Sequence, residues 1–458
     1  MLGLFWPKPR KGKMASARDE TFEPSYDSGL ISDRSHASNS SILSDMMKNT
    51  SKDGSLLEVV EISVTEQEKR TGNAAMGIKD VFTVYLVETC RVKDNSNNIA
   101  QLSMDSSSLW RRYSEFELLR NYLVVTFPHV VVPPLPEKRM MAMWQQLSTV
   151  DNFDADFVER RRIALEGFLQ RVAAHPLLCQ DELFHGFLQD AEGWKERVHS
   201  TGFQIKQDSR LKSLSASFRL KKPNRQFEEL KSYATDLQNN VTSILKIRSR
   251  LSDRLYGLHK IHGNYGRVFS EWSGIEQEMG DGLQSAGHHM DVYKDYIDDY
   301  MAEEEQIADQ LKEYIYFADS LKAVCRKQEI LQFELERCED LLNSKKLQKD
   351  QITGKAPQKV FSFRGMTSKL FGQDNAETKE SRAQLISDQI TDAEDAVEKA
   401  KQNIQDFTDN ALKEVDRFKR QKSRDLKEIF ISYAILQIKM AKRGITVWTN
   451  TKECFDKM

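Results

Sequence analysis

The second half of the chain carries a repeating apolar pattern with almost no proline, beginning near residue 226. Between residues 230 and 272 apolar side chains recur at alternating spacings of three and four over six heptads, and only Arg248 and His262 interrupt the series. This spacing is typical of helices that pack against a partner along their whole length. Polar residues at seam positions can select a partner, so Arg248 and His262 indicate selective pairing.

Two further stretches have the same helical spacing. Residues 307–325 and 386–411 predict a second and a third long helix, and the third continues toward residue 440 with two shifts of register. A sixty-residue helix extends roughly 90 Å at about 1.5 Å per residue, far beyond one compact domain. The content of 30% charged residues suits such solvated helices. We therefore expect three long helices whose apolar seams need a partner.

The first half of the chain divides into a polar tail and a compact domain. Residues 1–55 hold ten serines after residue 24 and few apolar side chains, which predicts a disordered tail. Short β-branched or aromatic stretches at 56–64, 81–90 and 107–113 predict three antiparallel strands. Helical spacing follows from Phe116, is broken by the prolines of residues 133–136, and returns at 156–172. The sequence thus predicts an α+β domain at 56–193.

Composition excludes several classes of protein. Because the formal net charge is only −2, any attraction to nucleic acid or to a membrane must come from local clusters of charge, and we expect no nucleic-acid partner. The five scattered cysteines indicate a reducing compartment, and no apolar run approaches the length of a membrane span, so we expect a cytoplasmic protein with peripheral membrane contact. Because no catalytic or cofactor-binding motif is found, we expect neither enzymatic activity nor a cofactor.

A cluster of cations around a proline turn predicts a phosphate-binding pocket. Arg112 can grip a phosphate with two parallel hydrogen bonds, and Tyr113 offers a ring face for a sugar-like ligand. Ser114, Lys138 and Arg161 supply a hydroxyl and two more cations. Strand alternation places Arg112 and Tyr113 on opposite faces unless the strand bends there. The alternative reading is a solvated strand edge with a packed tyrosine.

Three motifs resemble the signature of phox-homology (PX) domains: Arg-Arg-Tyr-Ser-Glu-Phe at 111–116, Val-Pro-Pro-Leu-Pro-Glu-Lys at 132–138, and Phe-Val-Glu-Arg-Arg-Arg at 157–162. Together with the helical second half, the chain from about residue 56 resembles the PX-BAR sorting nexins. The resemblance covers about seven-eighths of the chain. It implies an all-α BAR domain of three long helices at 226–458, and binding of phosphatidylinositol 3-phosphate on early endosomes.

The resemblance also implies roles for the pocket residues. In that family the arginine before the tyrosine grips the 3-phosphate, the tyrosine packs under the inositol ring, the lysine after the turn meets the 1-phosphate, and a helix arginine contacts the 4- and 5-hydroxyls. By motif these residues are Arg112, Tyr113, Lys138 and Arg161, with Ser114 at a further headgroup contact. Arg160 and Arg162 flank Arg161, so the register on that helix stays open.

Three segments outside the pocket are candidates for membrane contact. Met140 and Met141 follow the turn and predict an interfacial wedge. A basic amphipathic linker helix is expected at 194–225, and a basic tip with phenylalanines between the second and third long helices. Their contact residues are predicted to be Lys212, Phe218, Lys221, Lys359, Arg364 and Lys369. The alternatives are a linker folded onto either domain and a solvated loop.

These expectations describe a peripheral endosomal adaptor for protein sorting and recycling, with autophagy as a further expected role. The resemblance favours pairing with another PX-BAR sorting nexin over self-association, and implies cargo receptors as partners. A coiled-coil scaffold or tether whose PX fold binds protein is the alternative from another class. A lipid-modifying enzyme would need a catalytic constellation in residues 193–458, and the sequence offers none.

Overall fold

A computed structural model describes residues 55–73, 79–91, 106–137, 155–207, 219–352 and 376–458. Three antiparallel strands form one sheet in the order β1 (Val60–Asn73), β2 (Lys79–Arg91), β3 (Ser107–Arg112). The three-stranded prediction is confirmed, but the boundaries differ. The 3-10 helix η1 (Leu56–Glu58) precedes β1, and the β1–β2 ladder continues outward to the pair Asn73 and Lys79. Backbone pairing needs no apolar side chains, so the apolar pattern underestimated both strands.

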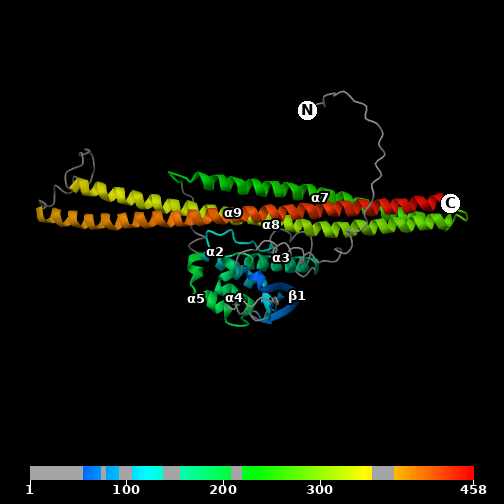
Figure 1. Cartoon of the computed structure of the whole chain (residues 1–458), viewed down its shortest axis with the longest axis horizontal. Helices are drawn as coiled ribbons and strands as arrows, with labels where there is room; N and C mark the ends of the chain where they lie inside the picture. The colour runs from blue at the N-terminus through cyan, green and yellow to red at the C-terminus, as the bar shows by residue number, and fades with distance from the viewer. Residues whose placement is uncertain (1–54, 74–78, 92–105, 138–154, 208–218, 353–375) are drawn as a thin grey trace, which may run out of the picture. The chain divides into compact units, whose positions relative to one another are not determined.

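Among the described residues, helices and a second 3-10 turn follow the sheet (Figure 1). They are α2 (Tyr113–Thr126), α3 (Ala155–Ala173), η2 (Leu178–Gln180), α4 (Glu182–Gln189) and α5 (Trp194–Ser200). Phe116 of α2, Phe168 of α3 and Phe187 of α4 are fully buried in the core against the sheet. Trp194, Val198 and Phe203 belong to the same core. The core therefore extends beyond residue 193, into the segment that the sequence predicts to be a linker.

The second half forms three long helices, as predicted: α7 (Arg225–Ser273), α8 (Gly280–Ile352) and α9 (Ala376–Asp456). Asn224 caps α7, because its side chain accepts a hydrogen bond from the backbone N–H of Gln226. Figure 1 shows α8 running back along α7, and α9 returning beside α8. Leu230, Tyr314 and Val415, one from each helix, lie in a shared core.

The two polar seam residues are paired inside the chain, which corrects the interpretation that they select a partner. Arg248 forms ion pairs with Glu304 and Glu305 of α8. His262 is buried, with its Nδ1 atom 3.4 Å from the sulfur of Met290, and burial lowers its pKa. Both residues therefore find their partners on α8, and they help to align α7 with α8 within one chain.

Two glycines allow α7 and α8 to approach closely. A Cβ atom added to Gly287 would lie 2.9 Å from the carbonyl oxygen of Gly266, a contact that backbone movement alone can relieve. Gly287→Leu should therefore lower the free energy of unfolding of the bundle by about 1–3 kcal/mol. The matched control is Gly257→Leu, which meets nothing within 4 Å and should be neutral or slightly stabilising. Thermal unfolding of both variants tests this, and equal stabilities would contradict the close approach.

Candidate functional site

The junction of β3 and α2 lies between Arg112 and Tyr113. The strand ends at Arg112, which has extended backbone angles (φ −80°, ψ 153°), and the helix begins at Tyr113. The carboxylate of Glu115 accepts a hydrogen bond from the backbone N–H of Arg112 at 2.7 Å, which fixes this first turn. Because the chain changes from strand to helix at this point, the rule of strand alternation does not apply across the pair.

The two adjacent arginines have different roles. Arg111 is buried and donates hydrogen bonds to the carbonyl oxygens of Phe187 (Nε, 3.0 Å) and Asp190 (Nη2, 2.6 Å). Burial lowers its pKa, and Glu115 partly offsets this. The guanidinium of Arg112 instead lies over the ring of Phe82, 3.5 Å from the centroid, and is half-buried. Arg111 therefore holds the fold, and Arg112 is the arginine nearer solvent.

Tyr113 and Arg161 are in direct contact. The guanidinium of Arg161 lies 4.7 Å from the ring centroid of Tyr113 and 4.3 Å from that of Phe157. The Tyr113 hydroxyl donates to the carbonyl oxygen of Pro136 at 2.6 Å, and burial raises its pKa to about 12. The Nη2 atom of Arg161 donates to the carbonyl oxygen of Glu137 at 3.2 Å. A tyrosine ring, a cation and the proline turn are thus assembled at one place.

The contacts of its neighbours settle which arginine of α3 faces Tyr113. Arg160 pairs with Glu305 of α8 at 2.9 Å, and Arg162 pairs with Glu159 of its own helix at 2.6 Å. Among the described residues, the Nε atom of Arg161 and the hydroxyl of Tyr85 are buried without a hydrogen-bond partner. Burial raises the pKa of Tyr85, and the nearby Arg161 opposes this. Arg161 is therefore the arginine of α3 that lies on Tyr113 and beside Tyr85.

The predicted residues divide into three groups. Tyr113 and Arg161 are brought together, Arg112 adjoins them in the chain with its guanidinium on Phe82, and Ser114 is exposed on the first turn of α2. Lys221 is described, and its ammonium pairs with Asp340 of α8 at 2.5 Å. The remaining predictions lie outside the described residues: Lys138, Met140, Met141, Lys212, Phe218, Lys359, Arg364 and Lys369.

Comparison with known proteins identifies the family. The family model of the PX domain matches residues 102–191. Sorting nexin-4 of Bos taurus is 55% identical over 403 residues, 88% of this chain and 88% of that protein, and sorting nexin-4 of Homo sapiens is 54% identical over the same shares. The chain belongs to the sorting nexins. The SNX-BAR protein Mvp1, solved by cryo-EM as a tetramer, is 18% identical, covers 85% of this chain and 99% of its own, and has a TM-score of 0.53.

The likeness to Mvp1 shows the PX-BAR fold, so the predicted fold class is confirmed. PX-BAR sorting nexins are non-enzymatic, membrane-associated sorting adaptors, and the chain is one of them. In the part of the chain that the structure describes, no cluster of side chains suits a metal ion, and no helix has the length and hydropathy of a membrane span.

The PX domain of this sorting nexin packs on the BAR helices through buried charges. Arg171 of α3 pairs with Asp425 of α9 at 2.7 Å and Glu313 of α8 at 2.8 Å, while the hydroxyl of Tyr314 donates to Asp425 at 2.6 Å. Burial alone would lower the pKa of Arg171, but the two carboxylates raise it well above its usual value. These interactions link α3 to two BAR helices. Sequence reasoning missed them because the partners are more than 140 residues apart.

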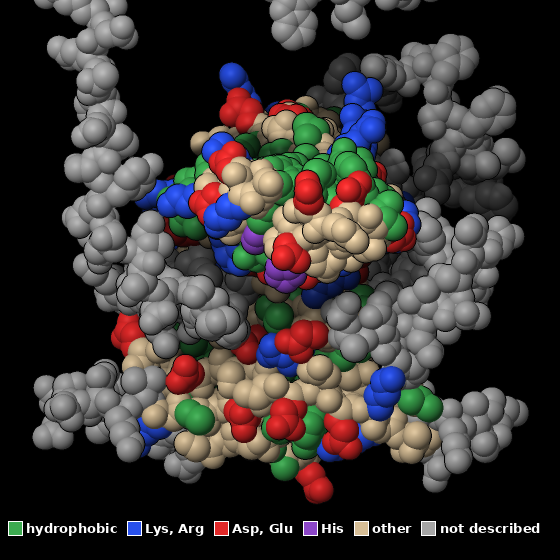
Figure 2. Space-filling model, turned by 90° about the vertical axis from the view of Figure 1, so that its right-hand side faces the viewer, with side chains coloured by type: hydrophobic (Ala, Val, Ile, Leu, Met, Phe, Trp, Pro, Cys, Tyr) green, Lys and Arg blue, Asp and Glu red, His purple; other side chains and the backbone are tan. Residues whose placement is uncertain are grey.

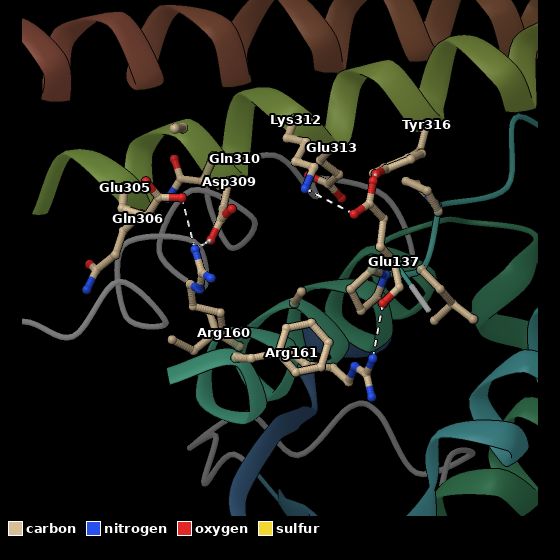
Figure 3. Close-up of a pocket in the computed structure, with 18 of the residues that line it drawn as sticks. Glu137, Arg160, Arg161, Glu305, Gln306, Asp309, Gln310, Lys312, Glu313 and Tyr316 are labelled. Carbon is tan, nitrogen blue, oxygen red and sulfur yellow. Dashed lines mark hydrogen bonds and ion pairs between the residues drawn. The ribbon is translucent and has the colours of Figure 1, made fainter. Parts of the chain in front are cut away.

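A cavity of about 480 Å³ lies beside these contacts, between α3 and α8 (Figure 3). Its lining is partly apolar, from Leu135, Phe157 and Ile163 among others. Figure 3 shows Arg160 pointing across it to Glu305 and Asp309, and Glu137 reaching α8 at its other end. At each end of the cavity, a charged side chain of the PX domain thus forms an ion pair with α8.

The sorting nexin also presents an outer apolar face on α7 and α9, which we define by its exposed large side chains. On and just after α7 they are Ile244, Ile247, Leu251, Ile261, Tyr265, Val268, Trp272 and Ile275, and on α9 they are Ile431, Ile435, Ile438, Ile445 and Trp448. The rings of His262 and Trp448 lie 5.9 Å apart, so the two rows are adjacent. Figure 2 shows hydrophobic side chains gathered over the upper side of the bundle, flanked by lysine and arginine.

The outer apolar face revises the predicted seams. The predicted α7 seam divides: Leu230, Ala234 and Leu237 are buried within the chain, whereas Leu251 and Tyr265 are exposed. On α9 the predicted positions, such as Ile429 and Leu436, are buried internally. The exposed series 431, 438 and 445 is a second heptad row that sequence analysis missed, because it overlaps the first in the same stretch.

Proposed function

We propose that this sorting nexin binds phosphatidylinositol 3-phosphate on early endosomal membranes, through a site made by Arg112, Tyr113 and Arg161. The observation that carries the proposal is the stacking of Arg161 on Tyr113, directly after Arg112 at the strand end. Guanidinium groups suit phosphate because they offer paired donors and a permanent charge. Ser114 and Lys138 complete the proposed headgroup contacts by their place in the motif.

We further propose that the outer apolar face pairs this chain with another PX-BAR sorting nexin or with a second copy. A surface row of isoleucines and aromatic residues at heptad spacing is unfavourable in water and favourable against a matching helix. Mvp1, which has the same fold, assembles as a tetramer. A pair would present two headgroup sites to one membrane and so raise avidity without new contacts.

We also propose that three segments outside the site contact the membrane. Their proposed contact residues are Met140 and Met141 after the proline turn, Lys212, Phe218 and Lys221 in the linker, and Lys359, Arg364 and Lys369 between α8 and α9. Basic residues near anionic lipid contribute about 1 kcal/mol each, so these segments would add to the headgroup contact. Sorting and recycling of cargo receptors, and a role in autophagy, belong to the same proposal.

Sedimentation of the full chain with vesicles tests the proposal. The protein should pellet with phosphatidylcholine vesicles that contain phosphatidylinositol 3-phosphate, and much less with vesicles of the same charge made with phosphatidylserine. Binding that ignores the 3-phosphoinositide would instead favour a scaffold whose PX fold binds protein.

Arg161→Ala should weaken binding to such vesicles at least tenfold, because a charged hydrogen bond contributes about 1.5–3 kcal/mol. Its neighbour supplies the control: Arg160 points to Glu305, so Arg160→Ala should bind nearly as the unaltered chain does. Sedimentation over a series of lipid concentrations gives both affinities. Equal losses in the two variants would mean that Arg161 has no special place in the site.

A further inference from the structure

The proline turn at 133–137 is held by side chains of the PX domain at three backbone oxygens. Arg120 donates from Nε to the oxygen of Pro133 at 3.0 Å, the Tyr113 hydroxyl donates to that of Pro136 at 2.6 Å, and Arg161 donates to that of Glu137 at 3.2 Å. Tyr113 and Arg161 are also residues of the proposed headgroup site. Any group that fixes the turn therefore fixes the site.

Side chains of helix α8 bind the same turn from the opposite side. The hydroxyl of Tyr316 donates to the carboxylate of Glu137, and the ammonium of Lys312 lies 3.2 Å from it. The Nη2 atom of Arg120 donates to the hydroxyl of Ser320 at 3.1 Å. Positions 312, 316 and 320 are four residues apart, so they lie on one face of α8. Figure 3 shows Lys312 and Tyr316 reaching Glu137 from above, and Arg161 reaching it from below.

The charge of Glu137 strengthens this contact. Burial by itself would raise the pKa of its carboxyl group, but the hydrogen bond from Tyr316 and the charge of Lys312 bring the pKa below its usual value. Glu137 is therefore ionised near neutral pH and accepts both bonds as a carboxylate. Bonds to an ionised acceptor are about twice as strong as neutral ones.

We propose that Lys312, Tyr316 and Ser320 of the BAR domain are positioning residues for the headgroup site. Through Glu137 and Arg120 they hold the proline turn, and the turn holds Tyr113 and Arg161. This inference rests on the proposed binding of phosphatidylinositol 3-phosphate. It makes headgroup affinity depend on the packing of the PX domain against α8, and by linkage a bound headgroup strengthens that packing by the same factor.

Calorimetric titration of the full chain with soluble dibutanoyl phosphatidylinositol 3-phosphate tests the inference without contributions from avidity. Tyr316→Phe and Glu137→Gln should each weaken binding about three- to tenfold, the range of couplings carried through packed networks. The double variant should bind the lipid no more weakly than the single variant with the lower affinity, because both changes act on the same hydrogen bond between Tyr316 and Glu137. Tyr300→Phe is the matched control, since the Tyr300 hydroxyl bonds Gln437 within the bundle, away from the turn.

The outcomes separate the two proposals. If the unaltered chain binds, Arg161→Ala does not, and Tyr316→Phe and Glu137→Gln bind as the unaltered chain does, the positioning role is overturned while the headgroup site stands. An equal loss in Tyr300→Phe would also overturn it, because the effect would then be one of bundle stability. If the unaltered chain does not bind the soluble lipid, both proposals fail.

Discussion

Arg171→Ala is expected to loosen the packing of the PX domain on the BAR helices by about 3–5 kcal/mol. The side chain of Arg171 is only 8% exposed, and its removal leaves Glu313 and Asp425 without their cation. Burial already raises the pKa of Glu313, so the acid would take up a proton more readily in the variant. Hydrogen exchange and limited proteolysis should show α3 opening far more often than in the unaltered chain.

Arg160→Ala is the matched control for this prediction. Its ion pair with Glu305 joins the same two domains, but its side chain is 40% exposed, and such pairs contribute about 1 kcal/mol or less. The two variants therefore each remove one arginine of α3, at positions about three turns apart, and the two arginines differ in burial. Similar protection of α3 in both would show that the buried cluster does not hold the domains together.

Placing charge on the outer apolar face should abolish pairing. In the double variant Ile438→Asp with Ile445→Asp, two side chains that are 55% and 67% exposed become carboxylates that pairing would bury. Each isoleucine lost from an interface forfeits about 1.5–3 kcal/mol, and burying the new charges costs more. We expect the free energy of dissociation of the pair to fall by more than about 5 kcal/mol. Sedimentation velocity of the chain, alone and mixed with another PX-BAR sorting nexin, measures this directly.

Leu347→Asp with Leu385→Asp provides the control, because these leucines are equally exposed but lie outside the outer apolar face, on α8 and α9. This variant should pair as the unaltered chain does. Pairing that survives in the Ile438 and Ile445 variant would show that another surface joins the two chains.

Much of the fold was predictable because its signals are local. Heptad spacing indicated all three BAR helices, and short β-branched runs indicated all three strands. The buried faces of the helices were harder to predict. Helices α7 and α9 each carry one buried and one exposed apolar row, and heptad spacing alone does not distinguish the two. Arg248 illustrates this: at a seam position it looked like a selector of partners, yet its partners are acids of α8 in the same chain.

The candidate site was predictable in composition and less so in geometry. The motifs predict Arg112, Tyr113 and Arg161 as site residues. Strand alternation predicts opposite faces for the first two, because a period-two pattern does not reveal that the strand ends at Arg112. Contacts such as Glu137 with Tyr316 join residues 179 positions apart, and no local signal announces them. The dependence of the site on α8 therefore required the folded structure.

The most direct test of the account is calorimetric titration of the full chain and of Arg112→Ala with soluble dibutanoyl phosphatidylinositol 3-phosphate. The unaltered chain should bind one lipid per PX domain, and Arg112→Ala should show no measurable heat while unfolding at the same temperature. Undiminished binding by Arg112→Ala would contradict the proposed site.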